Sequence, residues 1–365
     1  MKPNLRNFDL EEIRNFLKDL GEPSYRGDQV YHWITCKAAL TFEEMTNLPK
    51  NLRKELDKHF SLSLPEIMEL QADEEGTTKF ALKLEDGEII ETVLIPERDH
   101  FTLCVSTQVG CAMGCTFCLT AKSGFKRNLE VYEIISQVII AKRYLKEKGV
   151  ELPLRNIVFM GMGEPLANYK NLIKALKILE DKRGFNFSRK RLTVSTAGLV
   201  EKIYELAKDF PTALALSLHA PNDELRKKLM PVAKKYSLKD LIQALKAFPR
   251  VKNGRHTIEY VLIKDVNDSL IHAEELARLF KKLPVKINLI PFNPHPELPY
   301  ERPEEEKILA FQKHLLSHGI LTTVRKSKGL KISAACGQLR RRVIEKVLTP
   351  DTCDLKTAVR TGAVL

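Results

Sequence analysis

The sequence predicts an α/β protein built around a partial (β/α)6 barrel of the TIM type, preceded by a helical module and a small β meander. Two observations predict the barrel. Between residues 101 and 294, six strand-like runs alternate with amphipathic helices, which favours a parallel sheet covered by helices. Each run is followed by small, polar or glycine residues, and in a barrel all such loops meet at one mouth. An open doubly wound sheet is the alternative.

Residues 1–62 are predicted to form a helical accessory module. Apolar residues recur at helical spacing and stop at the Gly-Glu-Pro of positions 21–23. The module could bind nucleic acid through its basic side chains, and the alternative is a packing cap. Those side chains are Arg26, Lys50, Arg53, Lys54 and Lys58.

Residues 63–97 are predicted to form a three-stranded meander that links the helical module to the barrel. Apolar and polar residues alternate over 80–84, the Asp86-Gly87 pair is a turn signal, and 89–95 is a further strand. Glu91 lies inside that last strand, where a single glutamate is usually solvated. By itself the pattern gives Glu91 no role.

Residues 98–300 hold the barrel, and each strand ends in a loop suited to a shared site. The expected strands are 103–106, 156–160, 191–195, 212–217, 257–263 and 285–290. The residues that follow them include the cysteine loop, Gly161 to Pro165, Ser195 to Gly198, Ser217 to Pro221, Lys264 to Asp268 and Pro291 to His295. Residues 301–365 form a C-terminal extension with a helix, a strand at 321–324 and a small-residue loop around Cys336.

Three cysteines, Cys111, Cys115 and Cys118, stand in the loop after the first barrel strand. Clustered thiolates are soft ligands for iron–sulfur clusters, zinc or copper(I). Three of them would leave one iron of a four-iron cluster open to a small molecule. A structural zinc site is the alternative, because Cys104 could supply its fourth ligand.

Composition limits the setting of this chemistry. The 365 residues carry a net charge of +12, which favours a polyanionic partner such as nucleic acid. The N-terminus has no signal-peptide pattern and no apolar run is long enough to cross a membrane, so we expect a cytoplasmic protein. Seven cysteines in a chain of this length do not indicate a disulfide framework.

The Cys-x3-Cys-x2-Cys spacing, with Phe117 before the last cysteine, resembles the cluster loop of radical S-adenosylmethionine (SAM) enzymes. Further motifs narrow the resemblance to the RlmN family of ribosomal RNA adenine-C2 methyltransferases, and the match runs nearly from end to end. These motifs are Cys104, Gly161 to Pro165, Ser217 to His219, Pro291 to Pro294 and Ala335 to Leu339. A relative that methylates adenine C8 by the same mechanism shares most of them.

The resemblance implies a role for each matching residue. Cys111, Cys115 and Cys118 would bind one [4Fe-4S] cluster. Cys336 would carry the methyl group as S-methylcysteine, Cys104 would resolve it by forming a disulfide, and Glu91 would act as the base. The residues that would line the SAM site are Gly163, Glu164, Ser195, Ser217, Leu218, His219 and Asn293.

The implied reaction consumes two SAM molecules per turnover and methylates C2 of an adenosine in 23S rRNA. Transfer RNA is a second candidate substrate. Polar methyl transfer fails at an aromatic C2–H, so a methyl group on the Cys336 thiolate and a deoxyadenosyl radical from the second SAM are both needed. We also expect an electron donor such as flavodoxin. We expect a monomer, because nothing in the sequence demands a larger assembly, and no membrane partner, because no apolar run is long enough to cross a membrane. Two alternatives stay open: adenine-C8 methylation, and a non-enzymatic RNA-binding protein stabilised by zinc.

RNA would contact basic residues around the barrel mouth, which predicts salt-sensitive binding. The target adenosine must leave its stack, so a flipped or loop base is expected. The basic residues expected there are Lys122, Lys126, Arg127, Lys227, Lys228, Lys234, Lys235 and Arg340 to Arg342.

Overall fold

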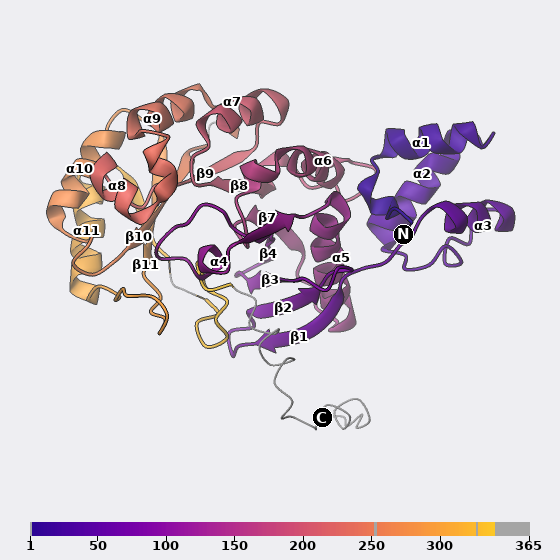
Figure 1. The fold of residues 1–365 in the computed structure, drawn as a ribbon, viewed down its shortest axis with the longest axis horizontal. Helices are drawn as coiled ribbons and strands as arrows, with labels where there is room; N and C mark the ends of the chain where they lie inside the picture. Colours follow the sequence, from indigo (N-terminus) through magenta and orange to yellow (C-terminus); the bar gives the residue numbers. More distant parts are fainter. Residues whose placement is uncertain (1, 252–253, 326–327, 340–365) are drawn as a thin grey trace.

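A ten-stranded sheet forms the body of the computed structural model, which describes residues 2–251, 254–325 and 328–339 (Figure 1). The strands are paired in the order β1-β2-β3-β4-β7-β8-β9-β10-β11-β12. Their bounds are β1 Glu66–Ala72, β2 Thr78–Lys83, β3 Ile89–Pro96, β4 Phe101–Cys104, β7 Leu154–Phe159, β8 Leu192–Thr196, β9 Ala213–Ser217, β10 His256–Leu262, β11 Val285–Pro291 and β12 Leu321–Val324.

From β4 to β12 the pairs are parallel and the spatial order follows the chain order without a reversal. Right-handed crossovers then place successive helices on the same side of the sheet, as in a barrel. A doubly wound sheet would need a reversal of strand order. The predicted partial barrel is therefore confirmed, and β12 adds a seventh parallel strand next to β11.

Helices of the barrel cover the outer face of the sheet (Figure 1). Their apolar faces join the strands in one core, which includes Ile135, Leu176, Leu206, Leu276 and Phe311. The helices are α5 Val131–Glu147, α6 Tyr169–Glu180, α7 Val200–Asp209, α8 Asp223–Leu229, α9 Leu238–Ala247, α10 Leu270–Phe280 and α11 Glu305–Ser317. None of the described helices is long and apolar enough to span a bilayer.

The predicted meander forms as β1, β2 and β3, and it extends the barrel sheet through antiparallel pairing of β3 with β4. This pairing places Val93 directly opposite Cys104. A separate two-stranded sheet, β5 Gln108–Gly110 with β6 Phe125–Asn128, flanks the short helix α4 Leu119–Lys122. The cysteine loop therefore lies between β5 and β6 in the chain, shortly after β4, the first strand of the barrel.

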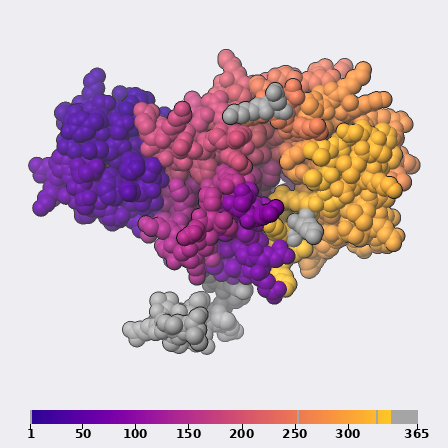
Figure 2. All heavy atoms as spheres, turned by 180° about the vertical axis from the view of Figure 1, so that it is seen from behind, coloured from indigo at the N-terminus to yellow at the C-terminus, as the bar shows by residue number. Residues whose placement is uncertain are grey.

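The N-terminal helices form a lobe at one end of the molecule (Figure 2). They are α1 Leu10–Asp19, α2 Tyr25–His32 and α3 Lys50–His59, and they bury a separate apolar core that includes Leu17, Val30 and Leu56. Polar contacts attach the lobe to the barrel: Asn7 Oδ1 accepts from the Tyr132 amide at 2.8 Å, and Lys174 Nζ lies 2.6 Å from Glu12.

Candidate active site

The loop that carries the three cysteines is held closed at its base by β5 and β6. Gly110 adopts φ +76, and a Cβ atom there would stand 1.7 Å from the Gly124 carbonyl oxygen, so only glycine fits. The same carbonyl accepts from the Cys111 amide at 3.1 Å. These contacts fix both ends of the loop while the cysteine side chains face the barrel mouth.

Cys111, Cys115 and Cys118 line one cavity at the carboxyl ends of the parallel strands. Other residues of its wall come from the ends of β7, β8, β9, β10 and β11. Of the strand-end residues predicted from the sequence, the cavity brings together Gly163, Glu164, Ser195, Ser217, His219 and Asn293. The expectation that separate loops converge on one mouth therefore holds for this set of residues.

The donor set at this cavity suits an iron–sulfur cluster. The three thiols of the loop, which are soft ligands, line it, whereas Cys104, the fourth ligand expected for a structural zinc site, does not. A [4Fe-4S] cluster held by three thiolates would leave one iron open to a small molecule. Burial raises the pKa of Cys111 to about 12 and raises the pKa of Cys115 and Cys118, so cationic iron would be needed to hold them as thiolates.

Glu164 and Gly163 form a rigid turn at the end of β7. Gly163 has φ +98, and a Cβ atom there would lie 2.9 Å from the Gln108 amide nitrogen. The Glu164 carboxylate accepts from the amides of Leu166 at 3.0 Å and Ala197 at 2.7 Å. Burial raises the pKa of Glu164 to about 7, while these amides favour the charged form.

His219 is a fixed, neutral part of the wall. Its Nδ1 accepts from the Val261 amide at 3.0 Å. Its ring packs edge-to-face with the Phe117 ring, and the two ring centroids are 4.8 Å apart. Burial and the neighbouring Arg226 lower the pKa of His219 to about 3. Leu218 does not line the cavity; its side chain is buried, and its amide donates to the Glu259 carbonyl at 3.0 Å.

Three buried acceptors on the cavity wall have no hydrogen-bond partner among the described residues: Glu259 Oε2, Asn293 Oδ1 and Gln338 Oε1. A buried polar atom without a partner is costly, so this wall suits a ligand that brings donors. SAM, with an ammonium group, ribose hydroxyls and an adenine amine, supplies them. The residues present therefore fit both the cluster and SAM.

A second cavity adjoins the first and contains Cys104. Cys336 and Cys118 line both cavities. The segment with Cys336 is attached to the cluster loop, because the Leu119 amide donates to the Gly337 carbonyl at 2.8 Å and Thr120 Oγ1 donates to Leu339 at 2.8 Å. Cys336 is thus held where the two cavities meet, although it lies more than 200 residues from both Cys104 and Cys118 in the sequence.

The thiols of Cys104 and Cys336 differ in environment. Cys104 is buried and Cys336 is exposed. Burial raises the pKa of Cys104 to about 12, and the nearby Arg325 guanidinium opposes that rise. Arg325 lies at the end of β12, and its own pKa is raised, chiefly by Cys336. A cation near Cys104 favours its thiolate, which is the reactive form of a thiol.

Glu91 lines neither of these cavities. It lies on β3 with its side chain buried, and its carboxylate is 3.2 Å from Lys79 Nζ, which is buried as well. Alternation along β3 puts Glu91 on the same face as Val93, the register partner of Cys104. Glu91 therefore lies on the same face of the sheet as Cys104, two residues along β3 from the residue that pairs with Cys104.

Sequence reasoning missed Glu259, Arg325 and Gln338, which line the first cavity. Arg325 directly follows a predicted strand, the signal that found the other strand-end residues. Glu259 interrupts an apolar strand run with a charge, and that interruption was a usable signal. Gln338 lay within the motif around Cys336 but had no assigned role.

The predicted basic residues are only partly available to an anion. Arg127 is engaged by Glu133 at 2.8 Å and by Asp86 at 2.6 Å. Lys228 pairs with Glu224, and Lys235 pairs with Glu201. Lys126, Lys227 and Lys234 are exposed. Arg340 to Arg342 and Cys353 lie outside the described residues.

Comparisons with known proteins agree with this site. The radical SAM superfamily model matches residues 105–285, and the model of the ribosomal RNA large subunit methyltransferase N-terminal domain matches residues 3–62. A dual-specificity RNA methyltransferase RlmN from Solidesulfovibrio magneticus is 47% identical over 92% of this chain and 96% of its own length. The enzyme of that name from Lawsonia intracellularis is 49% identical over 92% of this chain and 96% of its own length.

A solved structure shares the whole arrangement. The radical SAM methyltransferase from Sphaerobacter thermophilus is 44% identical and superposes with a TM-score of 0.87 over 93% of this chain and 99% of its own. Membership of the radical SAM superfamily implies a [4Fe-4S] cluster and SAM as cofactors. Together, the motifs, the cavity and the extent of these matches show that the chain belongs to the RlmN family of radical SAM RNA methyltransferases.

Proposed function

We propose that the protein methylates C2 of an adenosine in 23S rRNA and also acts on tRNA. The two RNA classes are suggested by the words dual-specificity in the names of its relatives. The C2 position follows from the resemblance of Pro165 and Pro291-Phe292 to the C2 enzymes. The single observation that supports the mechanism best is that Cys336 lines both the cavity of the cluster cysteines and the cavity of Cys104.

Cys111, Cys115 and Cys118 would hold the cluster, and Gly163, Glu164, Ser195, Ser217, His219 and Asn293 would form the SAM pocket around it. Leu218, which is buried and does not line this cavity, would support the wall through its backbone hydrogen bond to Glu259. When bound, the cluster and two SAM molecules per turnover supply the methyl group and the radical chemistry that an aromatic C2–H requires. The chain's part is to exclude water, hold the sulfonium cofactor against Cys336, and aim Cys336 at the RNA base.

The Cys336 thiolate would accept the methyl group and form a thioether, which is covalent catalysis by sulfur. The methyl carbon would lose one hydrogen atom to the radical chemistry that the bound cofactors would supply, and it would then bond to adenine C2. A base removes the C2 proton, and one electron would be given up to that same redox chemistry. The Cys104 thiolate attacks Cys336 sulfur; the carbon–sulfur bond breaks as the Cys104–Cys336 disulfide forms, the bond's electron pair stays with the departing carbon, which takes up a proton, and methylated RNA leaves. The nearby Arg325 guanidinium favours the Cys104 thiolate that this exchange needs and so opposes the effect of burial.

Glu91 is the proposed base. Its position on the inward face of β3, one residue pair from Cys104, supports the assignment. Its carboxylate forms a buried ion pair with Lys79, whose Nζ lies 3.2 Å away. Glu91 lines neither cavity, which makes it the least direct of the three catalytic assignments.

We also propose a role for each part of the chain. Residues 1–62 act as an accessory RNA-binding module, 63–97 as a meander that extends the barrel, 98–300 as the barrel, and 301–365 as the extension that brings Cys336 to the mouth. We further propose that the protein works as a monomer, with flavodoxin or a similar donor reducing the cluster.

The position of the new methyl group tests the proposal. The reconstituted protein is incubated with SAM, reductant and either a 23S rRNA fragment or tRNA, and the digested RNA is analysed by mass spectrometry against nucleoside standards. We expect 2-methyladenosine from both substrates. Finding 8-methyladenosine would assign the chain to the C8 chemistry. A colourless protein with one zinc and no deoxyadenosine from SAM would contradict catalysis altogether.

A further inference from the structure

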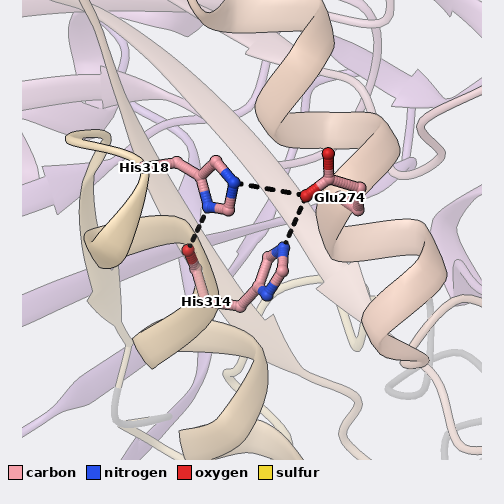
Figure 3. Close-up of side chains that lie close together, drawn as sticks. All are labelled: Glu274, His314 and His318. Carbon is pink, nitrogen blue, oxygen red and sulfur yellow. Dashed lines mark hydrogen bonds and ion pairs between the residues drawn. The ribbon is translucent and has the colours of Figure 1, made fainter.

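Two histidines and a glutamate meet on the outer helical layer, apart from the barrel mouth (Figure 3). His314 and His318 lie four residues apart at the carboxyl end of α11, and Glu274 lies on the neighbouring helix α10. Across the ranges 2–251, 254–325 and 328–339, this is the one group of three His, Cys, Asp or Glu side chains whose ligand atoms all lie within 4.8 Å of one another.

The distances between these atoms match the coordination shell of one metal ion. Glu274 Oε2 lies 2.9 Å from His314 Nε2 and 3.3 Å from His318 Nε2. Zinc binds imidazole nitrogen and carboxylate oxygen at about 2.0–2.2 Å, so a tetrahedral shell spaces its ligand atoms about 3.4 Å apart. An ion could therefore enter between the three side chains with small adjustments of their torsion angles.

The outer contacts of the group orient its ligands. His318 Nδ1 lies 2.8 Å from the His314 carbonyl oxygen, which can only accept, so Nδ1 carries the proton and Nε2 faces Glu274. Arg278 Nε donates to Glu274 Oε1 at 2.8 Å, which leaves Oε2 turned toward the histidines. Backbone carbonyls and charged partners that fix ligand orientation in this way are a regular feature of metal sites.

We propose that His314, His318 and Glu274 bind one divalent transition-metal ion of the zinc class. Two imidazoles with one carboxylate suit zinc, whereas magnesium and calcium prefer sets made of oxygen alone. The side chains are 26%, 41% and 32% exposed, which leaves a further coordination position open to water. The ion would link α10 to α11, the helix that precedes β12 and Arg325.

The test uses the full-length protein with its iron–sulfur cluster reconstituted anaerobically, so that the cluster cysteines cannot take up zinc. Zinc binding is measured by calorimetric titration, and zinc and iron are counted by mass spectrometry after gel filtration. We expect one zinc per chain with the iron content unchanged. His318→Ala and Glu274→Gln should each weaken zinc binding by more than tenfold, since losing even an outer partner of a metal ligand costs about 10–100-fold.

The matched control is His32→Ala, which removes an exposed histidine on α2, in the N-terminal lobe. It should bind zinc like the unmodified protein, and zinc should raise the thermal midpoint of both but not that of His318→Ala. Equal zinc affinity in all variants would overturn the proposal, because imidazole–carboxylate hydrogen bonding would then be the whole role of the group. X-ray absorption at the zinc edge of the unmodified protein gives an independent result: imidazole scattering is expected, and sulfur scattering would also overturn the site.

Discussion

The barrel mouth and the outer helical layer each gather metal-ligating side chains, and they do so in opposite surroundings. The mouth sets three thiols around a hollow whose wall holds unpartnered acceptors, while His314, His318 and Glu274 contact one another on an exposed face. The first arrangement is incomplete without bound groups, and the second is already satisfied by its own hydrogen bonds. The contrast shows that the mouth has space and unpartnered acceptors for bound groups, whereas the outer side chains already contact one another.

The largest effect should come from removing a cluster ligand. Cys115→Ala takes one of three thiolates from the mouth, so iron should be lost and no deoxyadenosine should form from SAM. Iron analysis and the visible spectrum after anaerobic reconstitution measure the loss. Cys36→Ala, which changes an exposed cysteine of the N-terminal lobe, is the control and should retain full iron. Iron retained by Cys115→Ala would mean that the loop does not bind the cluster as assigned.

Cys336→Ala separates the carrier from the cluster. It should abolish RNA methylation, because no other described thiol lines both cavities apart from Cys118, which is a proposed cluster ligand. Iron content should stay normal, since Cys336 is not one of the three proposed cluster ligands. Transfer of labelled methyl from SAM to RNA is the measurement. Residual turnover above background would place the carrier elsewhere.

Cys104→Ala should stop the reaction later. Methyl transfer to Cys336 should proceed, but without the resolving thiol the protein should remain joined to RNA through Cys336. A slowly migrating protein–RNA band on a denaturing gel, resistant to heat and removed by nuclease, is the expected product. Release of free methylated RNA at the normal rate would remove Cys104 from the mechanism.

A smaller effect is expected from Arg325→Gln. The guanidinium lowers the pKa of Cys104, so its loss should raise that pKa further and reduce the thiolate fraction about tenfold per unit. RNA release should slow at neutral pH and recover as the pH rises, because more thiolate then forms. Single-turnover release rates across a pH series measure this shift. An unchanged profile would show that Arg325 does not act on the resolving thiol.

The smallest effect concerns the outer group. Zinc at a concentration of about 100 times its dissociation constant should raise the free energy of unfolding by about 2.7 kcal/mol. A chelator that removes this zinc should therefore lower the thermal midpoint by several degrees and leave the iron in place. Loss of iron and zinc together would indicate one shared site and would erase the distinction between the two regions.

Local patterns predicted the elements and the strand-end residues well, because alternation and helical spacing depend on neighbours in the chain. Parallel strands bring their carboxyl ends together, and so Gly163, Ser217 and Asn293 could be placed at one mouth. The approach of Cys336 to Cys118 could not be read from spacing, since it depends on hydrogen bonds across more than 200 residues. The His314–Glu274–His318 group was missed because Glu274 is on another helix.

The proposed mechanism requires Cys336 to carry the methyl group between the two cavities. The direct measurement is peptide mass spectrometry of the reconstituted protein after incubation with SAM that carries a deuterated methyl group. The account predicts the label on the sulfur of Cys336, and its transfer to RNA when substrate is added. Label that reaches RNA without passing through Cys336 would contradict it.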